Sequence, residues 1–210
     1  PPRSTLFPYT TLFRSEEKEA QDMLDSVLYA GKRLLELIIN YTYYTTLLDL
    51  SLSGEKYPPE TTRHSQTVIY NGALDIAAKY NRHKDLKLVL EDSALNIADS
   101  HLHKIVTELT DNAFKYSGPG TEVSVRSFVQ DNYYYIKFNN EGKGFSREQV
   151  SKIAPFIQFG LTDREKAGSG LGLSIVKKIV DIYNGIFDID SQAYNFTAVT
   201  VALPLETVDE

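Results

Sequence analysis

The chain of 210 residues contains no cysteine and no tryptophan. Without cysteine it forms neither disulfides nor thiolate metal sites, and its four histidines do not have the spacing of metal ligands. It also lacks any run of about 18 apolar residues, so we expect a cytoplasmic chain whose only membrane attachment would come from segments upstream. The net charge of −6, with Lys and Arg scattered, predicts that nucleic acid is not a partner.

The remaining composition, 42% hydrophobic and 24% charged, is typical of a folded protein with room for one domain and a smaller appendage. The N-terminal stretch 5–15, TLFPYTTLFRS, resembles the translation of a common sequencing adapter. We therefore expect residues 1–15 to be an artefact outside the fold, and the natural protein to continue upstream.

Apolar periodicity divides the rest of the chain. Residues 16–52 have the three- and four-residue spacing of a long amphipathic helix, which needs a partner helix for its apolar face. Glycine and a proline pair indicate that residues 53–62 are a linker. We expect residues 63–207 to form the main domain and residues 208–210 a short tail. Without its partner the helix would expose an apolar stripe, which favours self-association.

Within the main domain the pattern alternates between helical and extended segments. Helices are predicted over 66–80, 99–116, 147–153 and from the glycine run at 168–172 to about 183; strands are predicted over 85–91, 121–129, 133–138, 186–190 and 197–204. This order predicts an α+β fold, a two-layer sandwich with helices on one face of a mixed, mostly antiparallel sheet.

Three separated stretches contain candidate ligand-binding residues. In the first, Glu108 and Asn112 share a helix face and offer hard oxygen ligands suited to Mg²⁺, and Lys115 can reach a phosphate. The second, 139–146, follows a strand, and its glycines leave backbone open to a flat ligand, while the Asn140 amide can pair with a ring edge. In the third, 168–172, bare backbone N–H groups can face anionic oxygens at a helix N-terminus.

Taken in this order, these stretches resemble the nucleotide-site motifs of bacterial sensor histidine kinases, of the ATP-binding superfamily shared with Hsp90, DNA gyrase B and MutL. The resemblance runs from about Glu16 to Leu205. The matching boxes are the N-box 108–116 (ELTDNAFKY), the first glycine box 140–144 (NEGKG), the phenylalanine box 155–159 (PFIQF) and the second glycine box 168–173 (GSGLGL).

The resemblance implies a Bergerat ATP-binding fold with ATP and Mg²⁺ as cofactors. It implies that Asn112 coordinates Mg²⁺, that Glu108 orients or activates the group attacking the γ-phosphate, and that residues 158–168 form a mobile lid. The ATP-binding residues that it implies are Asn112, Lys115, Tyr116, Asn140, Gly142, Gly144, Phe145, Phe159, Gly168, Ser169, Gly170, Leu171, Gly172, Leu173 and Thr197. The implied partners are a second copy, through a helical hairpin, and a response regulator or receiver domain.

The chain departs from the family pattern at two points. Asn140 stands where the family usually has an aspartate, which predicts weaker but retained ATP binding. No phospho-accepting histidine motif is present, and the helix at 16–52 resembles the second helix of the hairpin that carries it. We therefore expect a fragment that binds ATP, hydrolyses it slowly at most and does not phosphorylate itself.

Three functions are compatible with these residues. The first is the catalytic core of a protein-histidine kinase whose acceptor helix is missing. The second is a non-catalytic nucleotide-sensing or partner-binding module, which Asn140 and the missing histidine favour. The third is an ATPase of the gyrase, Hsp90 or MutL type, against which the phenylalanine box and the basic helix at 174–178 argue.

Overall fold

The computed structural model describes residues 7–53, 60–151 and 170–205. It contains two compact units, one ending at Ile39 and the other running from Asn40 onward, and helix α1 (Phe7–Ser53) extends from the first unit into the second. The helix begins at Phe7 and not at Glu16, so the prediction for its start was wrong. Between Phe7 and Glu16 the one proline, Pro8, lies in the first turn, where a helix tolerates it.

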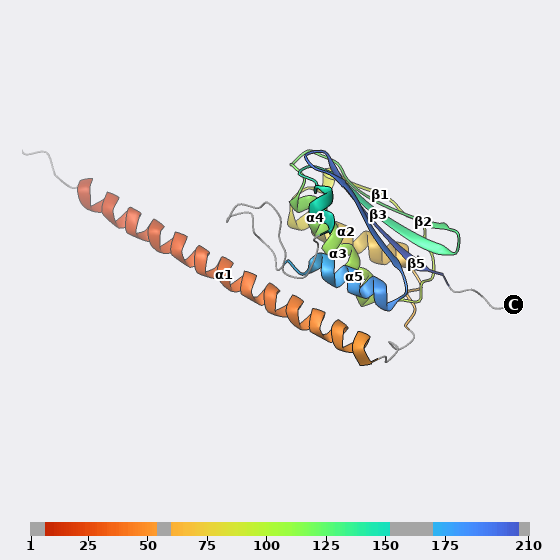
Figure 1. Cartoon of the computed structure of the whole chain (residues 1–210). Helices are drawn as coiled ribbons and strands as arrows, with labels where there is room; N and C mark the ends of the chain where they lie inside the picture. The colour runs from red at the N-terminus through yellow and green to blue at the C-terminus, as the bar shows by residue number, and fades with distance from the viewer. Residues whose placement is uncertain (1–6, 54–59, 152–169, 206–210) are drawn as a thin grey trace, which may run out of the picture. The chain divides into compact units, whose positions relative to one another are not determined.

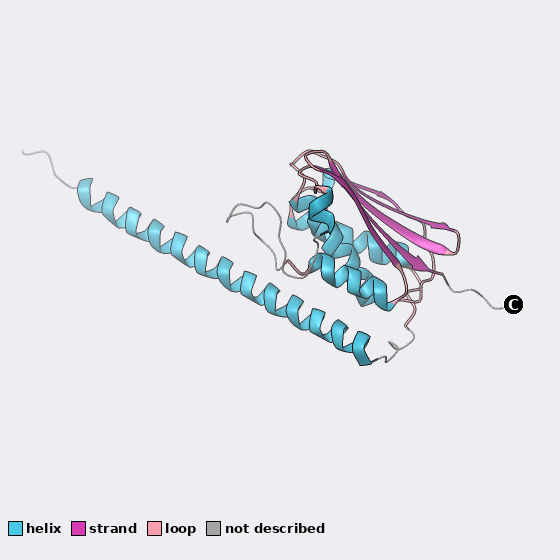
Figure 2. Ribbon diagram, in the orientation of Figure 1, coloured by secondary structure: helices cyan, strands magenta, loops and turns pink. Residues whose placement is uncertain are grey.

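The second unit is built on a five-stranded sheet with the order β1-β2-β3-β5-β4. Figure 2 shows the strands lying side by side as one layer. The strands are β1 (Leu86–Val89), β2 (Val123–Gln130), β3 (Tyr133–Glu141), β4 (Ile186–Gln192) and β5 (Phe196–Pro204). Only the β1–β2 pair is parallel among the described strands, which confirms the predicted mixed, mostly antiparallel sheet.

Helices cover one face of this sheet (Figure 1). The α-helices of the layer are α2 (Ser65–Lys79), α3 (Asp99–Lys115) and α5 (Gly172–Ile182), close to their predicted bounds; α4 (Arg147–Ser151) and a 3₁₀ turn (His83–Asp85) are short. The predicted two-layer α+β sandwich is therefore confirmed. The phenylalanine box, the lid at 158–168, Gly168, Ser169 and the tail lie outside the described residues.

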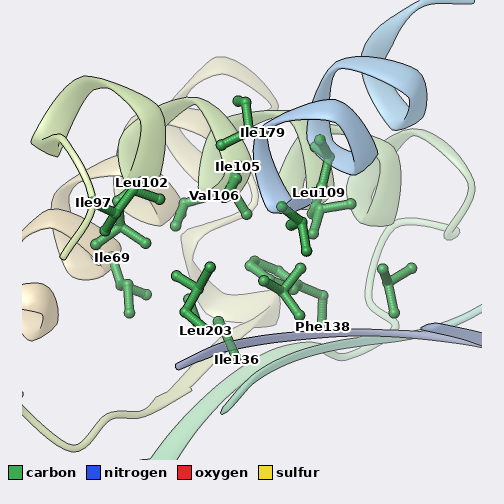
Figure 3. Packing of buried hydrophobic residues seen from close by; sticks show 14 of the residues in the cluster. Ile69, Ile97, Leu102, Ile105, Val106, Leu109, Ile136, Phe138, Ile179 and Leu203 are labelled. Carbon is green, nitrogen blue, oxygen red and sulfur yellow. The ribbon is translucent and has the colours of Figure 1, made fainter. Parts of the chain in front are cut away.

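The core lies between the two layers. Figure 3 shows Ile105 and Leu109 of α3 on the side toward Ile136 and Phe138 of β3, and Ile179 of α5 among the helices. All five side chains are buried, as the alternation of the strands and the helical spacing require. The core fixes α3 above the centre of the sheet, which is where the candidate site is found.

A tight turn sets the register of the central strands. Asp131 and Asn132 connect β2 to β3 and both have positive φ, +48° and +61°, as a two-residue hairpin turn with the twist of the flanking strands requires. The turn lies within the predicted 130–132. It pairs Tyr133 with Gln130, and from this register Tyr134, Ile136, Phe138 and Asn140 all face the helices.

Candidate functional site

A small cavity, partly open to solvent, lies between the C-terminal half of α3 and the sheet. The lining residues come from α3, β3, the loop after β3, α5, β4 and β5: Leu109, Asn112, Ala113, Tyr116, Phe138, Asn140, Phe145, Leu173, Ile189, Thr197 and Val199. Most of them are apolar, with a few polar groups among them, which is the usual make-up of a ligand pocket.

Helix α3 supplies one wall. Asn112 and Ala113 lie three and four residues after Leu109, and Tyr116, the C-cap residue, lies four and three residues after them, so all four fall on one face of the helix. Burial raises the pKa of the Tyr116 hydroxyl above its usual value, and the nearby Asp111 carboxylate raises it further. The Tyr116 ring meets the Phe145 ring edge to face at 6.0 Å between centroids, so an aromatic pair closes this end of the cavity.

The opposite wall is formed by cross-strand neighbours. Asn140 of β3 is paired directly with Thr197 of β5, and the pair Phe138 and Val199 lies two residues along the same face. Asn140 and Thr197 are buried, at 6% and 7% exposure, although both are polar. Buried polar groups in a cavity need partners, so this pair marks where a polar part of a ligand would bind.

A hydroxyl relay holds Thr197. The Ser191 hydroxyl accepts a hydrogen bond from the Phe145 N–H at 2.8 Å and donates to the Phe196 carbonyl at 2.7 Å. Since a hydroxyl carries one proton, the 3.0 Å contact between Ser191 Oγ and Thr197 Oγ1 must be donated by Thr197. The Thr197 oxygen is therefore left as an acceptor.

The glycines of the first glycine box have a role that the sequence did not predict. Instead of leaving backbone open for a flat ligand, Gly142 and Gly144 lie against protein backbone: added Cβ atoms would collide with the carbonyl oxygens of Tyr116 and Gln192. Gly144 also has φ +56°, which favours glycine. Neither glycine lines the cavity. Their close packing brings the following residue, Phe145, to the cavity wall.

At the other end of the cavity, α5 begins beside α3. An added Cβ at Gly172 would collide with Glu108 Oε2 and would come within 3.8 Å of Asn112 Nδ2. Glu108 and Asn112 therefore share a face, as predicted, and that face meets the N-terminus of α5. The partial positive charge of a helix N-terminus favours an anion at this point.

Glu108 is also ion-paired. Its Oε1 lies 2.6 Å from Lys104 Nζ, one helical turn away, and both side chains are about four-fifths buried, with 19% and 21% exposure. The same Nζ donates to Asn40 Oδ1 at 2.8 Å and lies over the Tyr43 ring at 5.6 Å. Lys104, which the sequence did not single out, thus connects Glu108 to the part of α1 that belongs to the second unit.

The structure brings together six of the predicted site residues in the lining of the cavity. These are Asn112, Tyr116, Asn140, Phe145, Leu173 and Thr197. Lys115 Nζ lies over the Tyr116 ring at 5.2 Å, Leu171 is buried in the core, and Gly170 has φ +69°; none of these three lines the cavity. Phe159, Gly168 and Ser169 lie outside the described residues.

Sequence reasoning missed the apolar part of the lining. Leu109, Ala113, Phe138, Ile189 and Val199 were not named as site residues. Helical spacing in 99–116 and strand alternation in 133–138 could have pointed to them, since residues on the faces of Asn112 and Asn140 must line the same space. Arg82 was also missed: its buried guanidinium donates to the carbonyls of Phe114 and Ser117, which anchors the end of α3.

Among the described residues, no group of three or more His, Cys, Asp and Glu side chains is arranged to hold a metal ion. No helix in the ranges 7–53, 60–151 and 170–205 is both long and apolar enough to cross a bilayer.

Comparison with known proteins gives the family. Residues 97–207 match the family described as histidine kinase-, DNA gyrase B-, and HSP90-like ATPase. The match covers α3, the sheet from β2 onward and α5, and so includes the whole lining of the cavity. The chain belongs to this ATPase family.

Relatives along nearly the whole chain are sensor kinases. The chain is 24% identical to the sensor histidine kinase YvrG of Bacillus subtilis, over 95% of this chain and 35% of the relative. It is 29% identical to the sensor protein CiaH of Streptococcus pneumoniae, over 94% of this chain and 45% of the relative. The chain thus spans less than half the length of these two relatives.

Solved structures show the same fold. The histidine kinase AdeS of Acinetobacter baumannii superimposes with a TM-score of 0.69 at 17% identity, over 96% of this chain and 98% of the other. The mycobacterial sensor histidine kinase MprB gives a TM-score of 0.60 at 24% identity, over 70% of this chain and 97% of the other.

Proposed function

We propose that the chain is the ATP-binding catalytic core of a two-component sensor histidine kinase, which transfers the γ-phosphoryl group of ATP to a histidine outside this chain. The observation that carries the proposal is the cavity between α3 and the sheet, in which Asn112, Asn140 and Thr197 converge. The sensor kinases among its relatives favour this function over a gyrase- or Hsp90-type ATPase.

The two ends of the cavity suit the two ends of a nucleotide. The purine would bind in the apolar slot between Leu109 and Val199, with its polar edge toward Asn140 and Thr197. The triphosphate would extend toward Asn112 and the start of α5 at Gly172, where the helix N-terminus favours negative charge. Lys115, Gly168, Ser169 and Gly170 are proposed to contribute on the phosphate side.

The residues present fit Mg²⁺ held mainly by the triphosphate. Mg²⁺ usually keeps several waters and takes one or two protein oxygens beside substrate phosphates. Asn112 would supply the protein oxygen, since it lines the cavity next to the N-terminus of α5. The bound ion would neutralise charge on the phosphates. Glu108, already paired with Lys104, is proposed to orient the attacking group and not to hold the metal.

The first unit supports the proposal that the full protein pairs through a helical hairpin. On α1 a row of apolar side chains is half to two-thirds exposed, with Leu24, Val27, Leu28, Leu34, Leu35 and Ile38 at 50–64%. Stable proteins normally bury such an apolar surface. In the full protein, the partner helix of the hairpin and the hairpin of a second copy of the protein would cover it. A response regulator or receiver domain would then accept the phosphoryl group.

Calorimetric titration with MgATP tests the proposed site. We expect saturable binding by the chain and at least a tenfold loss on Asn112→Ala, since that variant removes the proposed oxygen ligand. Asn139→Ala, on the exposed face of β3, is the matched control and should bind as the unchanged chain does. An absence of saturable binding at millimolar MgATP would overturn the proposal.

A transfer assay separates the kinase from a non-catalytic nucleotide-binding module. The latter reading is favoured by the neutral Asn140 amide in the cavity. The chain would be incubated with labelled ATP and an intact hairpin domain of a related sensor kinase. Acid-labile label on the hairpin supports the kinase, whereas ATP binding without transfer or hydrolysis supports the non-catalytic module.

A further inference from the structure

We propose that the Asn140–Thr197 pair makes the base site accept 6-oxopurine nucleotides as well as ATP. The inference rests on the proposed nucleotide site and names its substrate class more broadly: purine nucleoside triphosphates with either an amino or an oxo group at position 6. It follows from the hydrogen-bonding capacity of two buried side chains in the cavity.

Asn140 is fixed in place but presents a versatile group. Its backbone is paired on both sides, with Val123 of β2 and Thr197 of β5, so the position of the side chain is set by the centre of the sheet. Its carboxamide carries one acceptor oxygen and an NH₂ donor side by side. A half-turn of the amide plane exchanges the two, while the position of the group stays the same.

Little holds the amide in one of these orientations. Its one hydrogen bond among the described residues runs from Nδ2 to the Glu141 carbonyl at 3.4 Å, which is longer than a good N–H···O bond. A ligand that offers a better partner to either end of the amide therefore meets a small cost for reorienting it.

Thr197 supplies the fixed half of the pair. Its proton is donated to Ser191, because Ser191 Oγ uses its own proton on the Phe196 carbonyl. The Thr197 oxygen can therefore accept but has no proton left to donate. Adenine offers it the 6-amino group, and a 6-oxopurine offers it N1–H, so neither base is rejected at this position.

The two bases present opposite groups to Asn140 at position 6. Adenine has an amino donor there, with a second proton for Thr197, whereas hypoxanthine has an oxo acceptor and gives its N1–H to Thr197. The carboxamide pairs with either group, through its oxygen in one orientation and its NH₂ in the other. A carboxylate in its place would have acceptors only, and would pair with the amino group of adenine but repel the oxygen of a 6-oxopurine.

Titration with ATP and ITP, which differ only at this edge of the base, tests the inference. We expect the unchanged chain to bind MgATP and MgITP with dissociation constants within about fivefold of each other, since each base pairs with Asn140 at position 6 and donates one hydrogen bond to Thr197. Asn140→Asp should raise the ATP preference by about tenfold to a hundredfold. Asn139→Asp adds the same charge on the outer face of the same strand and should leave the ratio unchanged.

Two further outcomes keep the inference separate from the proposed function. ATP bound more than about thirtyfold tighter than ITP by the unchanged chain would overturn the inference and leave the ATP site intact. If neither nucleotide binds, both the inference and the proposed function fail.

Should Asn140→Asp not fold, Thr197→Val serves instead. It removes the acceptor that both bases use, so both affinities should fall while their ratio stays near one. A strong new ATP preference in this variant would contradict the role of Asn140.

Discussion

The carbonyl oxygen of Tyr116 fills the place that any side chain at position 142 would need. A hydrogen bond also joins these segments, because the Lys143 N–H donates to this oxygen at 3.2 Å. The end of α3 and the loop after β3 are thus locked together at the cavity, and the aromatic pair of Tyr116 and Phe145 sits on this junction.

Gly142→Ala is expected to destabilise the chain by about 1–3 kcal/mol, because the Cβ would force the loop away from α3. The free energy of unfolding in urea measures the change. Gly118→Ala is the matched control, since the nearest atom to its Cβ would be 3.9 Å away, and should change stability by less than about 0.5 kcal/mol. Equal losses in the two variants would contradict the close approach.

Parts of this site follow from local sequence and parts do not. The spacing of Asn112 and Tyr116 on a helix predicts a common face, and the structure confirms it. The pairing of Asn140 with Thr197 depends on strand order and register, which no local pattern contains. The role of Gly142 depends on which backbone approaches it, and the anchoring by Arg82 depends on a loop far along the chain; both are tertiary properties.

Arg82 should be among the costliest residues to replace. Its Nε pairs with Asp85 at 2.6 Å, and its other nitrogens reach the carbonyls of Phe114, Ser117, Gly118 and Thr121. Arg82→Met leaves these buried acceptors without a donor, so we expect a loss of about 3–5 kcal/mol in urea unfolding. Arg63→Met, at an exposed position, is the control and should cost less than about 0.5 kcal/mol.

Lys104 should act on turnover more than on nucleotide binding. If Glu108 orients the attacking group, Glu108→Gln should slow ATP hydrolysis about a hundredfold or more. Lys104→Met removes the group that holds the Glu108 carboxylate, so we expect an intermediate loss of about tenfold with ATP affinity nearly unchanged. Lys104→Arg, which can still pair with Glu108, should restore most of the rate. An equal fall in affinity and turnover in Lys104→Met would contradict a positioning role.

The buried imidazole of His101 is expected to make the folded chain less stable at low pH. It is 3% exposed, its Nδ1 lies 2.9 Å from the Tyr183 hydroxyl, and burial lowers the pKa of its imidazole below the usual value. The Tyr183 oxygen accepts the Ala98 N–H at 3.3 Å, and its hydroxyl can donate to the Nδ1 of a neutral imidazole. The unfolded chain takes up the proton near pH 6.5, earlier than the folded chain does as pH falls. The contribution of the neutral His101 to the free energy of unfolding is therefore complete above that pH and decreases below it, by at most about 1.4 kcal/mol per pH unit.

His101→Gln, which cannot be protonated, should show a shallower decline in unfolding free energy between pH 6.5 and 5 than the unchanged chain, whereas His83→Gln, at an exposed position, should not. Parallel pH profiles for the unchanged chain and His101→Gln would show that the buried imidazole is not the group responsible.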